Sequence, residues 1–170
     1  MKFDLYTMKK GENNKVDLNF TVAFDSIDYY GDVFKILTPI TVIGSIYNVD
    51  EQIFLTCNIT TDLEARCGRC LKTFTYPMMT KMNVELVEEG KVGEDDDTED
   101  IVVYEDNIID FDEIIKEEIL ANVPMKVVCD ENCKGLCGVC GKDLNVESCQ
   151  CNSSDDNIDP RLAELKKLLQ

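Results

Sequence analysis

The sequence predicts an α+β fold: an antiparallel sheet or partly open β-barrel, one or two late helices, and a zinc-stapled C-terminal segment. Three observations predict it. Apolar and polar residues alternate at period two through most of residues 16–87, which is typical of strands. Apolar residues at helical spacing occur only after residue 110, and eight of the nine cysteines gather in two groups. Consecutive strands followed by helices are typical of α+β proteins.

The predicted strands come first in the chain. Residues 16–24 and 40–47 each place their apolar side chains on one face. A longer alternation runs to Cys67 and resumes after Cys70, across a short turn that contains glycine. We therefore expect residues 53–87 to form a hairpin, with Cys67 and Cys70 at its tip.

An acidic run and the helices follow the hairpin. Residues 88–100 carry many carboxylates and little apolar surface, which predicts a solvated loop. Asp110 is a typical N-cap residue, and Glu113 stands in the capping-box position. The helix that Asp110 begins is expected to end at Pro124, because proline interrupts helical hydrogen bonding. A leucine stripe after Pro160 predicts a last helix.

These features divide the chain into three parts. Residues 1–128 are expected to form an α+β domain that includes the acidic loop 88–100. Residues 129–151 are expected to be a cysteine-rich, zinc-binding segment packed on hairpin 53–87, because their low apolar content cannot order them alone. Residues 152–170 are expected to be a linker and a C-terminal helix.

The amino-acid composition limits the classes of function that are open to this protein. The 170 residues carry 34 Asp and Glu against 17 Lys and Arg, a formal charge of −17. Such a chain is a poor general binder of nucleic acid and suits a basic partner, although the same charge could serve solubility alone. Histidine, the usual general base, is absent, and no phosphate-binding glycine loop occurs. We therefore expect no enzyme and no small-molecule substrate.

The chain shows no pattern that directs it to a membrane. No signal-peptide pattern follows Met1, and no run of about 18 apolar residues occurs. We expect a cytoplasmic protein with no membrane contact. In that reducing compartment, closely spaced cysteines indicate metal or redox chemistry before disulfides.

The cysteine spacing predicts structural zinc. Cys67-Gly-Arg-Cys70 and Cys137-Gly-Val-Cys140 are spaced as zinc knuckles, in which N–H groups of a tight turn hydrogen-bond to two thiolates. Without histidine, the ligands must be thiolates alone or thiolates with carboxylates. Cys57 is in phase with an apolar strand face, which predicts a core thiol. The candidate metal ligands are Cys67, Cys70, Cys129, Cys133, Cys137, Cys140, Cys149 and Cys151.

The number of ions and their identity stay open at this point. In one partition, Cys67, Cys70, Cys129 and Cys133 hold one zinc and the remaining four hold another; in the other, the two knuckles share a single zinc. Four thiolates can also hold an iron–sulfur cluster. A zinc-free dithiol oxidoreductase is the alternative of another class, but the residues after each Cys-x-x-Cys show no helical stripe, unlike the thioredoxin arrangement.

Basic residues are few and gather around the cysteines. Together they could form one basic face on an acidic protein, which could contact RNA phosphates. Equally, they could offset the negative charge of the thiolates. These residues are Arg66, Arg69, Lys72, Lys126, Lys134 and Lys142.

The chain resembles the YceD family, the large ribosomal RNA subunit accumulation proteins. The resemblance rests on Cys67-Gly-Arg-Cys70-Leu71, the run from Ile109 to Pro124, the run from Cys133 to Asn145, and Asp159-Pro-Arg161 before the last helix. It covers about residues 10–170. Each motif is weak alone, but the combination is specific.

The resemblance implies a non-enzymatic ribosome biogenesis factor that supports accumulation of large-subunit ribosomal RNA. The implied partner is precursor ribosomal RNA of the large subunit, bound by the basic face, or a basic large-subunit ribosomal protein, held by the acidic surface. Many family members lack most of these cysteines, so one or two structural zinc ions would stabilise the fold in this branch rather than perform the shared task.

Overall fold

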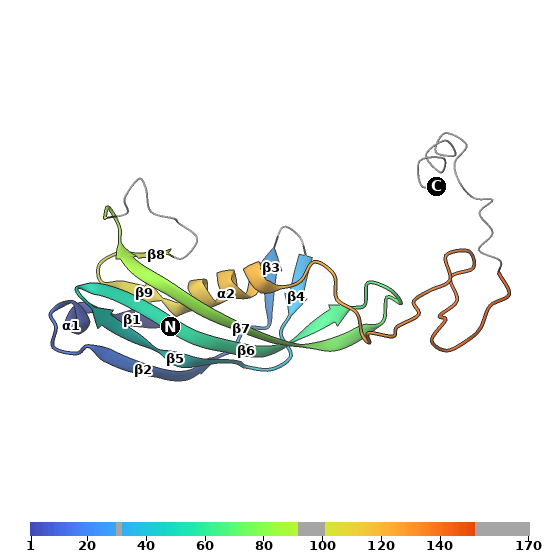
Figure 1. The fold of residues 1–170 in the computed structure, drawn as a ribbon, viewed down its shortest axis with the longest axis horizontal. Coiled ribbons are helices and arrows are strands. Elements are labelled where there is room, and N and C mark those ends of the chain that lie inside the picture. Colours follow the sequence, from blue (N-terminus) through green and yellow to red (C-terminus); the bar gives the residue numbers. More distant parts are fainter. Residues whose placement is uncertain (30–31, 92–100, 152–170) are drawn as a thin grey trace, which may run out of the picture.

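The structure is a computed structural model that describes residues 1–29, 32–91 and 101–151. Strands dominate, and the molecule is elongated because two long strands extend well past the rest of the sheet (Figure 1). The elements are β1 (Lys2–Asp4), α1 (Tyr6–Lys9), β2 (Lys15–Val22), β3 (Ser26–Tyr29), β4 (Asp32–Lys35), β5 (Ile40–Val49), β6 (Gln52–Arg66), β7 (Thr73–Glu88), β8 (Ile101–Tyr104), β9 (Ile108–Asp110) and α2 (Phe111–Asn122).

A five-stranded open sheet forms the centre, in the order β2-β5-β6-β7-β8. All neighbours are antiparallel except β7 and β8, which are parallel. Two-stranded sheets of β1 with β9 and of β3 with β4 complete the described strands. The predicted α+β class with an open, mainly antiparallel sheet is confirmed.

The predicted hairpin is the longest feature of the sheet. β6 and β7 pair from Ile53 with Leu86 out to Arg66 with Thr73, so the turn between them holds Cys67 and Cys70. Burial follows the expected period of two along β6, where the apolar face is inside. Cys57 lies on that face with 1% exposure, as predicted for a core thiol.

Helix α2 lies along one face of the sheet (Figure 1). Its buried residues include Phe111, whose ring meets that of Phe20 edge to face with centroids 5.1 Å apart. The predicted cap is present, because the Asp110 carboxylate accepts from the N–H of Asp112. The helix ends at Asn122, two residues before Pro124, as expected.

Several details differ from the sequence-based expectations. The first strand ends at Val22 rather than Phe24, and the second continues to Val49. Short elements that carry little periodic signal were not predicted, among them helix α1 near the start of the chain. Most of the predicted acidic loop (92–100) and the whole of the predicted linker and C-terminal helix (152–170) lie outside the described residues. No helix in the described part of the chain has the length and apolar character needed to cross a membrane.

Candidate metal centre

The hairpin turn forms a cysteine knuckle. The N–H of Cys67 donates to the carbonyl of Lys72 at 2.9 Å, and the N–H of Leu71 donates to the carbonyl of Cys67 at 3.0 Å. This closed turn directs backbone N–H groups at sulfur, and Arg69 N lies 3.4 Å from Cys67 Sγ. Leu71 adopts a left-handed backbone, with φ of 62°, to close the turn.

The second Cys-x-x-Cys repeats this geometry. The N–H of Cys137 donates to the carbonyl of Lys142 at 2.8 Å, and the N–H of Gly141 donates back to the Cys137 carbonyl at 2.9 Å. Gly141 has φ of 73°, at the position that Leu71 occupies in the first knuckle. Glycine takes this conformation without a steric cost. The two turns are therefore the same local structure built from different sequences.

The eight cysteines form two groups of four. In each group, the four Sγ atoms lie within 4.8 Å of one another. Site 1 consists of Cys67, Cys70, Cys129 and Cys133; site 2 consists of Cys137, Cys140, Cys149 and Cys151. The structure does not bring the two knuckles together in one group, so the arrangement with a single shared ion is not formed.

The sulfur spacing in site 1 fits a tetrahedral thiolate centre. Four sulfurs about 2.3 Å from a zinc ion stand about 3.8 Å apart. Cys67 and Cys133 Sγ are 3.8 Å apart, and Cys70 and Cys129 Sγ are 3.6 Å apart. These separations are far too long for a disulfide bond, and all nine cysteines are free. The donor set suits zinc, and four thiolates also suit an iron–sulfur cluster.

The two sites differ in burial. In site 1, Cys67 has 0% exposure, Cys70 8% and Cys133 5%. They pack with Phe74, Val128 and Leu136 in a small cluster separate from the main core. In site 2, Cys140 is exposed and Cys137 and Cys149 are half-buried. Site 1 is thus shielded between the hairpin and the following chain, whereas site 2 faces solvent.

The knuckle turns prepare one thiolate in each site. The Cys70 N–H lowers the pKa of Cys67 to about 6, and the Cys140 N–H does the same for Cys137, also to about 6. Burial raises the pKa of Cys129 to about 12, and hydrogen bonding with the Cys140 thiol raises that of Cys151 to about 12. A cation bound among the sulfurs would favour the thiolate form of all four.

The geometry offers little to a dithiol oxidoreductase. In thioredoxin-like sites, a Cys-x-x-Cys begins a helix and its first sulfur is exposed. Here Cys70 is followed by β7, the region after Cys140 forms turns, and Cys67 is fully buried. Cys137 is the exception in exposure, since it is half-buried and has a lowered pKa.

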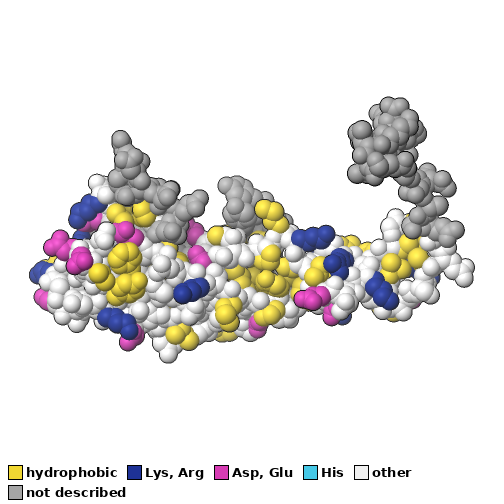
Figure 2. Space-filling view, viewed as in Figure 1, with side chains coloured by type: hydrophobic (Ala, Val, Ile, Leu, Met, Phe, Trp, Pro, Cys, Tyr) yellow, Lys and Arg dark blue, Asp and Glu magenta, His cyan; other side chains and the backbone are white. Residues whose placement is uncertain are grey.

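The basic residues divide into two sets. The Arg69 guanidinium donates to the carbonyls of Glu131 and Cys133, both at 2.9 Å, and so ties the two halves of site 1 together. Lys142 forms an ion pair with Glu147 at 3.1 Å, and Arg66 Nε donates to the Leu71 carbonyl. The remaining lysines are exposed and form no ion pair among the described residues; they are Lys72, Lys126 and Lys134. Figure 2 shows Lys and Arg side chains over the hairpin end of the molecule.

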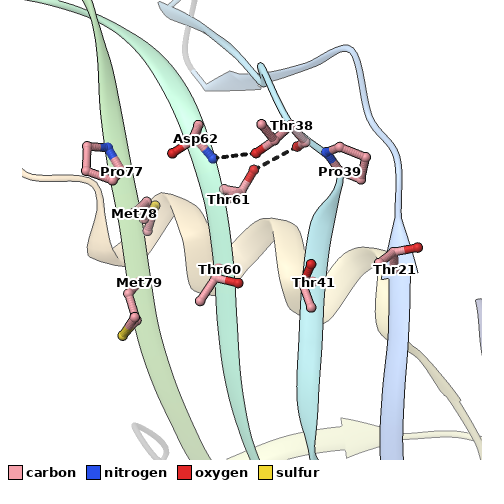
Figure 3. Close-up of a pocket in the computed structure, with 10 residues that line it drawn as sticks. All are labelled: Thr21, Thr38, Pro39, Thr41, Thr60, Thr61, Asp62, Pro77, Met78 and Met79. Atoms are coloured by element: carbon pink, nitrogen blue, oxygen red, sulfur yellow. Dashed lines mark hydrogen bonds between the residues drawn. The ribbon is translucent and has the colours of Figure 1, made fainter.

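A hollow of about 690 Å³ lies on the sheet face opposite α2, away from the cysteine sites (Figure 3). Its floor is a row of paired residues from four strands: Thr21, Thr41, Thr60 and Met79. At its rim, the Thr61 hydroxyl donates to the Thr38 carbonyl at 2.9 Å. The hollow combines threonine hydroxyls with methyl groups and has no nucleophile paired with a base, so it offers no catalytic arrangement.

Sequence reasoning gave no role to two residues that the site uses. Leu71 completes the knuckle with a left-handed backbone that glycine usually supplies. Asn145 stands in the site 2 loop, yet its side chain reaches Cys133 of site 1. The sequence does carry a signal for the role of Leu71, because Leu71 follows Cys67 by four residues, as Gly141 follows Cys137.

Comparison with known proteins links the chain to a described family. Residues 55–169 match the family described as "Large ribosomal RNA subunit accumulation protein YceD". The protein YlbN of Bacillus subtilis (strain 168) is 28% identical over 171 residues, which cover 100% of this chain and 97% of YlbN.

Mycobacterial relatives match over a shorter region. Rv2926c of Mycobacterium tuberculosis (strain ATCC 25618 / H37Rv) is 27% identical over 127 residues, which cover 72% of this chain and 58% of that protein. ML1660 of Mycobacterium leprae (strain TN) is 28% identical over 134 residues, which cover 77% of this chain and 59% of that protein. No solved structure matches the chain.

Proposed function

Because the chain belongs to the YceD family, we propose that it is a non-enzymatic ribosome biogenesis factor that supports accumulation of large-subunit ribosomal RNA. The family match over residues 55–169 is the observation that carries this proposal, since it includes most of the hairpin, helix α2 and both cysteine sites. The proposal places the protein in the cytoplasm, where thiols remain reduced.

We propose that the metal ions have a structural role. Sites 1 and 2 each hold one zinc ion through four thiolates, and a bound ion supplies a fixed crosslink rather than a reacting group. The sulfur separations of 3.6 and 3.8 Å in site 1 support it. Elemental analysis of protein purified without added metal should find about two zinc per chain. A value near zero, or iron with inorganic sulfide, would contradict it.

The favoured partner is precursor ribosomal RNA, bound at the hairpin end. Lys72, Lys126 and Lys134 support this choice, because they are exposed and free of ion pairs among the described residues. Lysines of this kind can neutralise phosphates, and the affinity should then fall as salt rises. Arg69 and Lys142 are bound within the protein and contribute less.

A basic ribosomal protein is the second candidate partner, and a different surface favours it. A hollow of about 490 Å³ lies among β8, β9 and α2. Five carboxylates line it: Glu89, Glu105, Asp110, Glu113 and Glu117. The hydrogen bond and repulsion from Glu89 raise the pKa of Glu105, which is typical of carboxylates that lack a cation between them. A lysine-rich segment would complement this surface.

The test is affinity purification of the full chain from cells at native expression, followed by identification of RNA and protein. Recovery of large-subunit precursor RNA that RNase removes, together with any ribosomal proteins, supports direct RNA binding. Ribosomal protein that stays bound after RNase supports the second candidate. Recovery of no ribosomal component would overturn the proposed function.

A charge-matched pair of variants locates the surface. The test variant replaces Lys72, Lys126 and Lys134 with alanine, and the control replaces three lysines elsewhere, Lys10, Lys15 and Lys81. Both variants lose the same charge. RNA recovery should fall about tenfold or more only in the test variant, because only that variant loses lysines that contact phosphates. Each lost phosphate contact should also reduce the salt dependence of binding. Equal loss in both would indicate a general charge effect.

A further inference from the structure

Asn145 connects the two cysteine sites. It belongs to the loop between the two cysteine pairs of site 2, yet its side-chain nitrogen lies 3.4 Å from the Sγ of Cys133, a member of site 1. An amide N–H that points at a thiolate spreads its charge and orients it. Asn145 therefore contacts a ligand of site 1, although it is carried by the loop of site 2.

Asn145 makes three further hydrogen bonds, and its neighbour Leu144 makes a fourth that holds the same loop. Its carbonyl oxygen Oδ1 accepts from the N–H of Lys134 at 2.7 Å. Its own backbone N–H and its side-chain nitrogen both donate to the Asp143 carboxylate, at 2.9 and 2.7 Å. The backbone N–H of Leu144 bonds to the Gly135 carbonyl at 2.9 Å, which closes the loop over the chain beside Cys133. The side chain is thus fixed in one orientation.

The loop that carries Asn145 is held by hydrogen bonds but by no hydrophobic packing. Val146 is 80% exposed, and no residue from 137 to 151 belongs to either hydrophobic cluster. Besides its hydrogen bonds to residues 134 and 135, the loop would be anchored by an ion bound to the cysteines at its two ends, Cys137 and Cys140 before it and Cys149 and Cys151 after it. Without an ion at site 2, ordering this loop costs about 1–2 kcal/mol of backbone entropy per residue.

We propose that Asn145 is a positioning residue that makes the two metal sites cooperative. An ion at site 2 orders the loop, the loop presents the Asn145 amide to Cys133, and site 1 then binds its ion more tightly. The inference rests on the proposed metal binding at both sites. Residues that contact a metal ligand through a hydrogen bond typically change metal affinity 10- to 100-fold. By reciprocity, an ion at site 1 strengthens site 2 by the same factor.

The test measures cobalt binding to the full chain, by competition with a chromophoric chelator, in four proteins: wild type, Asn145→Ala, a Cys149→Ser/Cys151→Ser variant that disables site 2, and the combination. We expect Asn145→Ala to weaken site 1 about 10-fold or more. Disabling site 2 should weaken site 1 by a similar factor. Adding Asn145→Ala to that variant should change site 1 little, because the amide is already lost from Cys133.

Site-resolved spectra and a matched control complete the design. Cadmium-113 NMR of the loaded protein gives one signal for each four-cysteine site, and Asn145→Ala should shift the site 1 signal. Asn132→Ala is the control, since Asn132 lies beside Cys133 but uses its backbone N–H to contact Asp130; it should leave both signals and affinities unchanged.

The outcomes separate the two proposals. If wild type binds two cobalt ions but the effects of Asn145→Ala and of disabling site 2 multiply, the sites are independent and the coupling is overturned while metal binding stands. If wild type binds no cobalt at all, the metal proposal fails and the coupling fails with it. Non-multiplying effects confined to site 1 support the coupling.

Discussion

Removing metal should unfold the hairpin end and the cysteine-rich segment while the central sheet stays folded. The structure supplies the reason, because the main core contains none of the eight cysteines of the two sites. Those in the small second cluster are joined by three half-buried hydrophobic residues, Phe74, Val128 and Leu136. That cluster is too small to order residues 129–151 unaided.

The expected size of the effect follows from the ion's contribution. Structural zinc in small thiolate sites supplies about 10–16 kcal/mol of folding free energy at neutral pH. Losing even about 4 kcal/mol raises local opening about a thousandfold, since each 1.4 kcal/mol is a factor of ten. Hydrogen bonds of the knuckles, such as Cys137 N–H to the Lys142 carbonyl, should then lose nearly all protection from exchange.

Hydrogen–deuterium exchange with mass spectrometry, with and without a strong chelator, checks this. Peptides from 124–151 and the turn at 67–72 should exchange within seconds after chelation. Peptides from β5 and the first half of β6 should keep their protection, because their pairing and burial do not involve the sites. Persistent protection of 129–151 after complete metal loss would refute the argument that the ions order this segment.

Further predictions concern glycines and the core thiol. Gly141→Ala should weaken metal binding at site 2 about fivefold, because a left-handed φ of 73° costs a side chain about 1 kcal/mol; Gly138→Ala, with open space around its Cβ, should change little in the same chelator competition. Gly44→Ala should destabilise the sheet by about 3 kcal/mol in urea unfolding, since its Cβ would lie 2.5 Å from the Cα of Cys57; an unchanged midpoint would contradict this close strand contact. In metal-free protein at pH 8, iodoacetamide should modify eight cysteines and spare Cys57. Cys57 is buried, and burial raises the pKa of its thiol to about 11. Rapid labelling of Cys57 would show that the core opens.

Periodicity predicted the parts of the fold that bury a continuous face. The hairpin was visible because β6 and β7 alternate over 15 and 16 residues, so one polar interruption at Thr61 did not hide the pattern. Thr61 is buried all the same, because its hydroxyl finds a partner in the Thr38 carbonyl. Helix α2 could be predicted because two independent signals indicate the same helix: Asp110 is a typical N-cap residue, and the apolar stripe begins directly after it.

Other features depend on tertiary contacts that the sequence does not display. Strands of three residues, such as β1 and β9, have too few positions to show a period. The parallel pairing of β8 with β7 reflects where the chain re-enters the sheet, not its local pattern. Spacing proposed the cysteine ligands but left two partitions open. The structure groups Cys129 and Cys133 with the hairpin knuckle because the N–H of Gly68 bonds to the Val127 carbonyl at 2.8 Å.

The fate of the basic residues bears on how an acidic protein could contact RNA. A four-thiolate zinc site carries a net charge of about −2, so nearby cations could serve only to offset it. Arg69 fits that description, because its guanidinium is committed to two carbonyls within site 1. Lys72, Lys126 and Lys134 do not, since they point charge into solvent with no ion pair among the described residues. If these lysines served only to offset the thiolate charge, they would not need to stay exposed at one end of a chain with a formal charge of −17. Under the proposed metal binding, ions at sites 1 and 2 would hold the turns that carry these lysines. Removal of metal should then abolish RNA binding, even though no ion contacts the RNA.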